Sequence, residues 1–313
     1  MNQIKTSPKD FFLHLGATIA LYVGVIALIN LFFTVINYYF PDALAGDYFS
    51  SSIAWPVSIL IVVTPIIYFI EWLINKDIKL IPEKAGIWIR KWRIYLTLFI
   101  GAIVIAGDLI TLINTYLNGE ISIRFVYKFL VILIITSIVF TYYIFDWINK
   151  YFKIKILLSY LGLIVALIGI ILGFVIVGSP TKQRSIRFDN QRIADLQNIQ
   201  WQIINYWQQK GKLPIKLDDV NDPISNSVVP VDPETNEVYE YNVKNPTTFE
   251  LCAIFDLDQQ EIKGRGPYGH GGTSVFRDIA YPMVPENVNW MHSSGRVCFE
   301  RVIDIDKYPI IKK

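Results

Sequence analysis

A single carboxylate, Asp108, lies deep inside a long apolar stretch of the sequence. An ionised carboxylate in hydrocarbon costs several kcal/mol unless it is paired, hydrated or protonated. Lys128 in the next apolar stretch is the candidate partner, because its flexible side chain could close most of the distance. We predict either a structural pair that fixes helix packing or a residue that lines a proton or ion path. An aspartyl-type intramembrane protease would need two carboxylates at one site, and the sequence places only one at this depth.

A second group of reactive side chains lies near the C-terminus, where Arg265, His270 and His292 are candidate ligand-binding residues. The two histidines could in principle join Asp256 and Asp258 in a metal site. Their spacing matches no zinc pattern, and the acidic segment lacks the glycine of an EF-hand loop. We therefore expect exposed loop histidines, no resident metal and no cofactor.

The elements that must position these residues are long and apolar. Hydrophobic residues make up 53% of the chain and charged residues 18%, compared with about 25% charged in soluble domains. A helix needs about 20 residues to cross about 30 Å of hydrocarbon. Five stretches reach that length: 11–40, 53–74, 94–117, 125–148 and 156–178. The first is about twice as long as a signal-peptide core, so we expect an uncleaved signal anchor.

Basic residues in short loops predict the orientation of these spans, since cytoplasmic loops retain Lys and Arg. The side with the N-terminus and the second and fourth loops carries eleven of them, whereas the opposite side carries only Arg124 and Lys128. We expect the N-terminus in the cytoplasm and the C-terminal region outside the cytoplasmic membrane. Residues 179–313 hold 16 Lys and Arg against 18 Asp and Glu, which does not fit a nucleic-acid-binding surface.

The pattern changes from uniformly apolar to amphipathic after residue 178. Hydrophobic residues recur every three or four positions from Ile193 to Tyr206, which predicts a helix with one buried stripe. Gly211 and Pro214 predict its end. Strand-like segments follow at 237–243, 248–255 and 296–303.

The expected fold class is a membrane all-α bundle of five transmembrane helices, followed by a small α+β extracytoplasmic domain. We divide the chain into a four-helix transmembrane domain, a fifth span that continues into the amphipathic helix, and a β-rich extracytoplasmic domain. These parts cover 1–155, 156–211 and 212–313.

Both cysteines, Cys252 and Cys298, fall in predicted strands of the outward domain. An even number of cysteines in an oxidising compartment indicates one disulfide. The chain-entropy model gives a stabilisation on the order of 4 kcal/mol for a loop of this length. Two separate buried thiols or one functional thiol are the alternatives.

Short motifs in the C-terminal half resemble a known family. After a membrane helix and an amphipathic helix come QQKGKLP (208–214), LDDV (217–220), DP (232–233), YEY (239–241) and FELCA (249–253). In this order, over residues 160–256, they resemble type IV pilins and the major pseudopilin of type II secretion. The resemblance implies a long helix on a small antiparallel sheet, and calcium as the ion to consider because pseudopilins often hold one.

Two departures from the pilin pattern bear on function. Gly173-Phe174 is not followed by the glutamate that accompanies prepilin processing, and the helix is internal, so we expect no processing into a pilus. Residues 1–155 separately resemble an uncharacterised family of four-helix bacterial membrane domains, from SPKDFFLHL (7–15) onward. That resemblance implies no activity.

Three functions compete at this point. The leading hypothesis is a non-enzymatic membrane protein that displays its outward domain to a peptide or another cell-envelope component. The alternative is a transporter or channel subunit that uses Asp108, which would require an oligomer. An outward-facing hydrolase would depend on His270 or His292. The sequence leaves the oligomeric state open.

Overall fold

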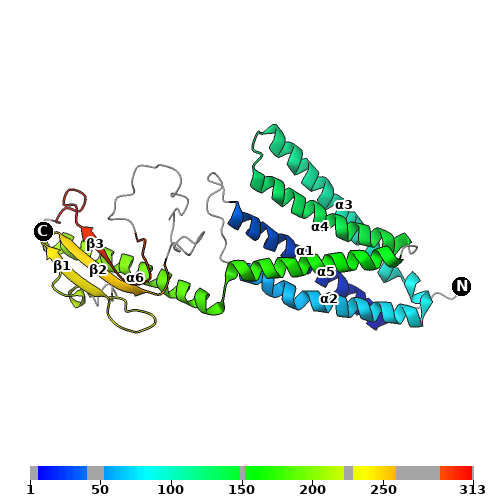
Figure 1. Ribbon diagram of the computed structural model, residues 1–313, viewed down its shortest axis with the longest axis horizontal. Coiled ribbons are helices and arrows are strands. Elements are labelled where there is room, and N and C mark those ends of the chain that lie inside the picture. Colours follow the sequence, from blue (N-terminus) through cyan, green and yellow to red (C-terminus); the bar gives the residue numbers. More distant parts are fainter. Residues whose placement is uncertain (1–5, 41–52, 149–151, 222–227, 259–289, 312–313) are drawn as a thin grey trace. The chain divides into compact units, whose positions relative to one another are not determined.

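The computed structural model of the 313-residue chain describes residues 6–40, 53–148, 152–221, 228–258 and 290–311. The chain forms two compact units, Met1–Gly178 and Ser179–Lys313. We call them the membrane unit and the C-terminal unit. Figure 1 shows the helices and strands of each.

Among the described residues, five helices are long and apolar enough to cross a bilayer. They are α1 (Pro8–Tyr39), α2 (Ala54–Leu80), α3 (Trp88–Leu117), α4 (Ile123–Ile148) and α5 (Phe152–Val177). Large hydrophobic side chains such as Phe12, Ile110 and Leu157 are exposed on these helices, as lipid-facing surfaces require. The predicted set of five spans is confirmed, and it is the architecture of a multi-pass membrane protein.

Two of these helices run farther than hydropathy predicts. α2 continues to Leu80, a short 3-10 turn follows at Pro82–Gly86, and α3 begins at Trp88. The basic segment expected as a loop is therefore mostly helical, because Lys and Arg are good helix formers and nothing ends the helix at the edge of the apolar stretch. Arg90 and Arg93 are consequently buried residues of α3 and not loop residues.

The core of the membrane unit lies between α1, α2, α4 and α5. Glycines allow close approach there, since Val57 of α2 leaves no room for a Cβ at Gly173 of α5. α3 packs mainly on α4, and Figure 1 shows this pair diverging from the other three helices toward one end. Beyond Thr97, Asp108 is the one residue of α3 that is buried among the described atoms.

α6 (Pro180–Lys210) begins the C-terminal unit. Gly178 adopts a left-handed conformation with φ 74°, and the Ser179 hydroxyl oxygen accepts the N–H of Lys182 as a helix cap. The segment expected as one continuous helix over 156–211 is thus divided into α5 and α6. Gly211, with φ 68°, ends α6 where the sequence predicts.

The sheet of the C-terminal unit consists of β1 (Glu240–Asn245), β2 (Thr248–Phe255) and β3 (Gly295–Val302), antiparallel and in that order. The structure also contains a short 3-10 turn, η3 (Leu217–Val220). Odd-numbered residues of β2 face α6 and form one hydrophobic core with its apolar stripe. Full burial of such a side chain contributes about 1.5–3 kcal/mol. The stripe consists of Ile193, Leu196, Ile199 and Ile203.

Candidate functional sites

Four acidic side chains surround one buried arginine in the C-terminal unit, Arg192 of α6. Its guanidinium contacts Asp232 through Nε at 2.7 Å, Asp189 through Nη1 at 2.8 Å and Glu234 through Nη2 at 2.7 Å. Asp256 lies 3.4 Å from Nη1. We call these five residues the Arg192 cluster.

The buried carboxylate of Asp189 links the Arg192 cluster to the end of β2. It accepts the backbone N–H groups of Asp256 and Leu257, both at 3.0 Å. Charge-assisted hydrogen bonds of this kind are stronger than neutral ones. The cluster therefore ties α6 to two irregular segments, one of which contains Asp256.

The electrostatics of the Arg192 cluster stabilise its charged forms. Burial would raise the pKa of Asp232, but the Arg192 guanidinium and two backbone N–H groups hold that pKa below its ordinary value. Burial would lower the pKa of Arg192, and the surrounding carboxylates outweigh it and raise that pKa. Sequence reasoning missed this cluster. Its signal is that Asp189 and Arg192 fall on the apolar stripe of α6, four residues before Ile193 and Leu196 respectively.

His292 is buried, which corrects the expectation of an exposed loop histidine. Its ring stacks on Phe255 with 3.8 Å between ring centroids, and its Nδ1 lies 3.4 Å from the Ser293 carbonyl oxygen. Burial lowers its pKa. The histidine is accommodated in the core because its ring packs on Phe255 like another aromatic side chain. The other two predicted ligand residues, Arg265 and His270, lie outside the described residues.

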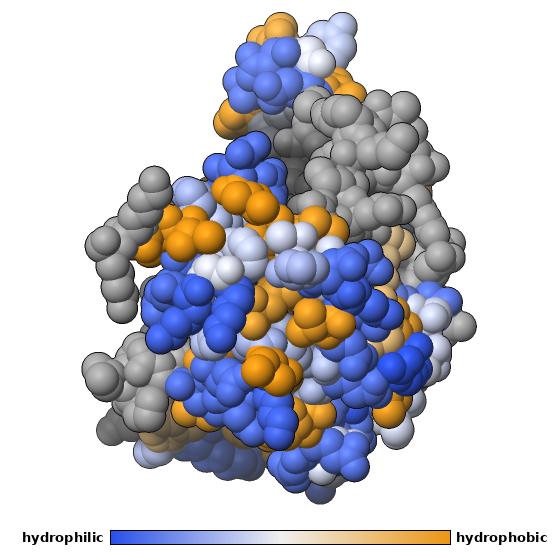
Figure 2. All heavy atoms as spheres, turned by 90° about the vertical axis from the view of Figure 1, so that its left-hand side faces the viewer, coloured by the Kyte–Doolittle hydropathy of each residue, from blue (hydrophilic) through white to orange (hydrophobic). Residues whose placement is uncertain are grey.

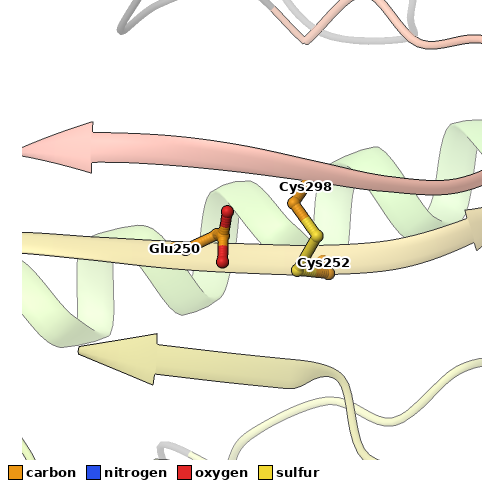
Figure 3. A group of neighbouring side chains, drawn as sticks. All are labelled: Glu250, Cys252 and Cys298. Atoms are coloured by element: carbon orange, nitrogen blue, oxygen red, sulfur yellow. A yellow bond between two sulfur atoms is a disulfide. The ribbon is translucent and has the colours of Figure 1, made fainter. Parts of the chain in front are cut away.

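Cys252 of β2 and Cys298 of β3 form the predicted disulfide. The two residues are paired directly across the strands, with their Cα atoms 4.0 Å apart. Figure 3 shows Glu250 beside them on the same sheet, and its carboxylate and both sulfurs lie within 4.8 Å of one another. Thiolates and carboxylates are metal ligands, but sulfurs bonded to each other are not thiolates. The group is therefore a structural cross-link and not a metal site.

Buried charges also gather at one end of the membrane unit, where α1, α3 and α5 begin and α2 and α4 end; we call it the ionic end. Arg93 of α3 contacts Glu71 of α2 at 2.6 Å. Asp146 of α4 contacts Arg90 of α3 at 2.9 Å and also pairs with Lys155 of α5. These pairs connect α2, α3, α4 and α5.

A second set of ion pairs brings α1 into the ionic end. Asp10 caps α1 together with Ser7 and accepts the Lys84 ammonium at 2.8 Å. Asp77 of α2 pairs with Lys9 at 2.7 Å and lies 3.6 Å from Lys84. The hydrogen bond from Lys84 to Asp10 raises the pKa of the lysine. Every helix of the membrane unit thus contributes at least one charge to this network.

Glu71 and Asp146 correct another expectation. Their positions near helix ends predict carboxylates solvated at the membrane interface, whereas the structure pairs both with buried arginines. The cause is the early start of α3, which places Arg90 and Arg93 inside the bundle. His14 of α1 is also buried at this end, and its Nδ1 has no hydrogen-bond partner among the described residues.

Asp108 lies on the same helix as Arg90 and Arg93 but differs from them in its surroundings. It is 9% exposed, and its Oδ2 has no hydrogen-bond partner in the described part of the chain. The nearby Thr111 hydroxyl donates instead to the Gly107 carbonyl oxygen at 2.8 Å. Lys128 places its ammonium 5.3 Å from the ring centroid of Phe33 on α1. No ion pair within the described ranges joins Asp108 to Lys128, and the role of Asp108 stays a prediction.

Comparison with known proteins finds that part of the membrane unit is similar to a family without an assigned function. A family model described as a domain of unknown function, DUF5671, matches residues 10–142. No curated protein and no solved structure matches the chain. The expectation of an uncharacterised domain in the N-terminal half is thus confirmed, while the likeness to pilins has no counterpart in these comparisons.

The DUF5671 match covers most of the ionic end. Asp10, His14, Glu71, Arg90 and Arg93 fall inside it, as does Asp108. Asp146 and Lys155 fall beyond its last matched residue. The ionic network therefore extends from the DUF5671 region into the end of α4 and the start of α5.

Proposed function

We propose that the protein is a membrane-anchored binding protein of the bacterial cell envelope. In this proposal the five helices anchor the chain in the cytoplasmic membrane, with the N-terminus in the cytoplasm because the basic loops are retained there. The C-terminal unit stands outside the membrane and engages a polypeptide or another envelope component. The protein does so without catalysing a reaction.

The face of the β-sheet opposite α6, which the described residues leave uncovered, is the observation that carries this proposal. Odd-numbered residues of β2 pack on α6, and the opposite face carries Ile254 and Val302, which are 59% and 54% exposed. Charged pairs surround these apolar residues, with Arg296 bonded to Glu240 at 2.5 Å and Lys244 lying 3.2 Å from Glu250. Apolar contacts within a polar rim are the usual anatomy of a protein–protein interface.

The surface character of the C-terminal unit also supports a role in an aqueous compartment. Figure 2 shows hydrophilic residues over much of the face turned to the viewer, with hydrophobic residues scattered among them. Large exposed hydrophobic residues are far more frequent along the five membrane helices. The disulfide supports an oxidising compartment, which is where such bonds persist.

The pilin-like motifs suggest which kind of partner the C-terminal unit binds. A helix packed along an antiparallel sheet, as α6 packs on β2, is the arrangement that the pilin and pseudopilin resemblance implies. A pseudopilin-like domain would make the partner another component of the cell envelope. The internal position of α5 argues against polymerisation, so we propose binding and not fibre formation.

Photocrosslinking in intact cells tests the proposal. A photoreactive amino acid at Ile254 reports on the uncovered sheet face, and the same amino acid at Ile215, which is 81% exposed and lies before η3, is the matched control. We expect a discrete adduct from position 254 that is absent at 215 and is lost in Arg296→Glu. Equal labelling at the two positions, or none at 254, would contradict the proposal.

A second candidate function is a transporter or channel subunit. The observation that favours it is the buried Asp108, whose Oδ2 has no hydrogen-bond partner among the described residues. Polar groups at membrane depth often mark ion or proton pathways. Reconstituted protein in liposomes tests this with a pH-sensitive dye. A proton flux that disappears in Asp108→Asn would support transport, whereas no flux above empty liposomes would remove it.

A further inference from the structure

A cavity of about 140 Å³ lies inside the membrane unit between α1, α2, α4 and α5. Twelve of its fourteen lining residues are apolar, and the other two are Thr64 and Tyr68. The cavity is partly open to the surface of the bundle. Protein interiors are close-packed, and the atoms that line an empty space lose dispersion contacts, so a void of this size requires an explanation.

Small residues create this space. Gly24 of α1 and Gly162 and Ala166 of α5 line the cavity. A Cβ at Gly162 would meet no described atom within 4 Å, whereas a Cβ at Gly173 on the same helix would collide with Val57. Gly173 thus permits two helices to touch, and Gly162 keeps the space unfilled.

The lining decides the chemistry of an occupant. The cavity has no charged lining residue among those described. The Tyr68 hydroxyl already donates to the Ser159 carbonyl oxygen at 2.6 Å, so its proton is not available to a ligand. Water needs two to four polar partners to be held in a buried site, and this cavity does not supply them. The occupant that fits is apolar.

The depth of the cavity identifies the source of an apolar occupant. Gly162 lies ten residues after Phe152, where α5 begins at the ionic end, or about 15 Å along the helix. The hydrocarbon core of a bilayer is about 30 Å thick. A partly open cavity at this depth lies near the middle of the hydrocarbon core, where lipid acyl chains reach it.

The geometry points to a binding site for one acyl chain of a membrane lipid. Leu28, Leu60, Ile138 and Val165 supply the apolar walls. Gly162 supplies the free volume. Occupation by the chain restores the dispersion contacts that the empty cavity lacks.

Photolabelling of the full-length protein in nanodiscs tests this site. The probe is phosphatidylglycerol with a diazirine at the middle of one acyl chain, chosen because basic residues near a membrane favour an anionic lipid. Labelled residues are mapped by mass spectrometry. We expect the lining residues of α1 and α5 to be labelled in a saturable manner, with at least about fivefold competition by excess unlabelled lipid, whereas the exposed second half of α3 is labelled in proportion to bulk lipid.

Gly162→Leu fills the cavity and should reduce labelling of its lining at least about fivefold. Gly107→Leu is the matched control, because a Cβ at Gly107 also meets no described atom within 4 Å and Gly107 does not line the cavity. Should Gly162→Leu fail to fold, Ala166→Val supplies the same test. Labelling of the lining that rises linearly with bulk lipid, or that is unchanged in the folded cavity-filling variant, overturns the inference.

Discussion

The buried charged residues in the two halves of α3 differ in whether they form ion pairs with other described residues. In its first turns, Arg90 and Arg93 are buried and each meets a carboxylate from another helix. Farther along, Asp108 is equally buried and its Oδ2 has no hydrogen-bond partner among the described residues. α3 packs mainly on α4, and its described buried residues other than Asp108 all lie between Ile89 and Thr97. We expect from this contrast that the paired charges contribute more to the packing of α3 than Asp108 does.

Removal of a paired charge should produce the largest effect. Arg93→Met leaves Glu71 without its partner inside the bundle, and loss of one member of a buried ion pair costs about 3–5 kcal/mol. Unfolding in detergent micelles by added denaturing detergent measures the loss. Lys91→Met on the same helix is the control, since Lys91 is exposed. Equal stability of the two variants would contradict the proposal that the ion pair of Arg93 stabilises the bundle.

The Arg192 cluster allows the same comparison of paired and unpaired charges in the C-terminal unit. Arg192→Met leaves four acidic side chains near one another and should destabilise this unit by about 2–4 kcal/mol, somewhat less than in the membrane because Glu234 is partly solvated. Hydrogen exchange of the β2 backbone amides reports the change within the full chain. Arg187→Met, at an exposed position of α6, should leave exchange unchanged.

Asp108→Asn should have a smaller effect, of opposite sign or near zero. The substitution keeps the shape of the side chain and removes a charge that no described group compensates, so we expect the stability to change by about 1 kcal/mol or less, in the stabilising direction. The same detergent titration provides the measurement. A loss of about 3 kcal/mol would show that Asp108 is paired in the folded protein, and the two halves of α3 would then be alike.

The last prediction concerns the pH dependence that the buried His292 gives to the C-terminal unit. Because burial holds its pKa below the ordinary value of about 6.5, the unfolded chain takes up a proton at higher pH than the folded one. Stability of the C-terminal unit should therefore fall as pH decreases below about 6.5, by at most about 1.4 kcal/mol per pH unit. Hydrogen exchange at pH 7 and 5.5 measures this slope, and His292→Phe should reduce it while preserving the stack on Phe255.

The sequence was sufficient to predict the elements and insufficient to predict their polar contacts. Hydropathy and length identify the five spans because hydrocarbon excludes unpaired backbone groups. The stripe from Ile193 to Ile203 and the pairing of Cys252 with Cys298 were also predictable, since each follows from local periodicity or from the number of cysteines. These features need no knowledge of which helices are neighbours.

Ion pairs between distant elements require that knowledge. Arg93 and Glu71 are separated by the 3-10 turn and by the unexpected start of α3, and Asp232 meets Arg192 only after the chain has folded back on α6. A positively charged segment beside a membrane span usually predicts a solvated loop. In this protein, ion pairs with other helices bury Arg90 and Arg93 of that segment instead. The same reasoning fails for His292, whose aromatic neighbours become visible only in the folded sheet.

The cross-strand bridge between Cys252 and Cys298 has a consequence for the fate of the chain after cleavage. A protease that cut the polypeptide anywhere between these two residues would produce two fragments that remain covalently joined. On a gel, the nicked protein would migrate as one species without reductant and as two species with it. The last strand of the sheet would stay attached to the membrane-bound fragment, so a single cut in that interval would not release it into the surrounding fluid.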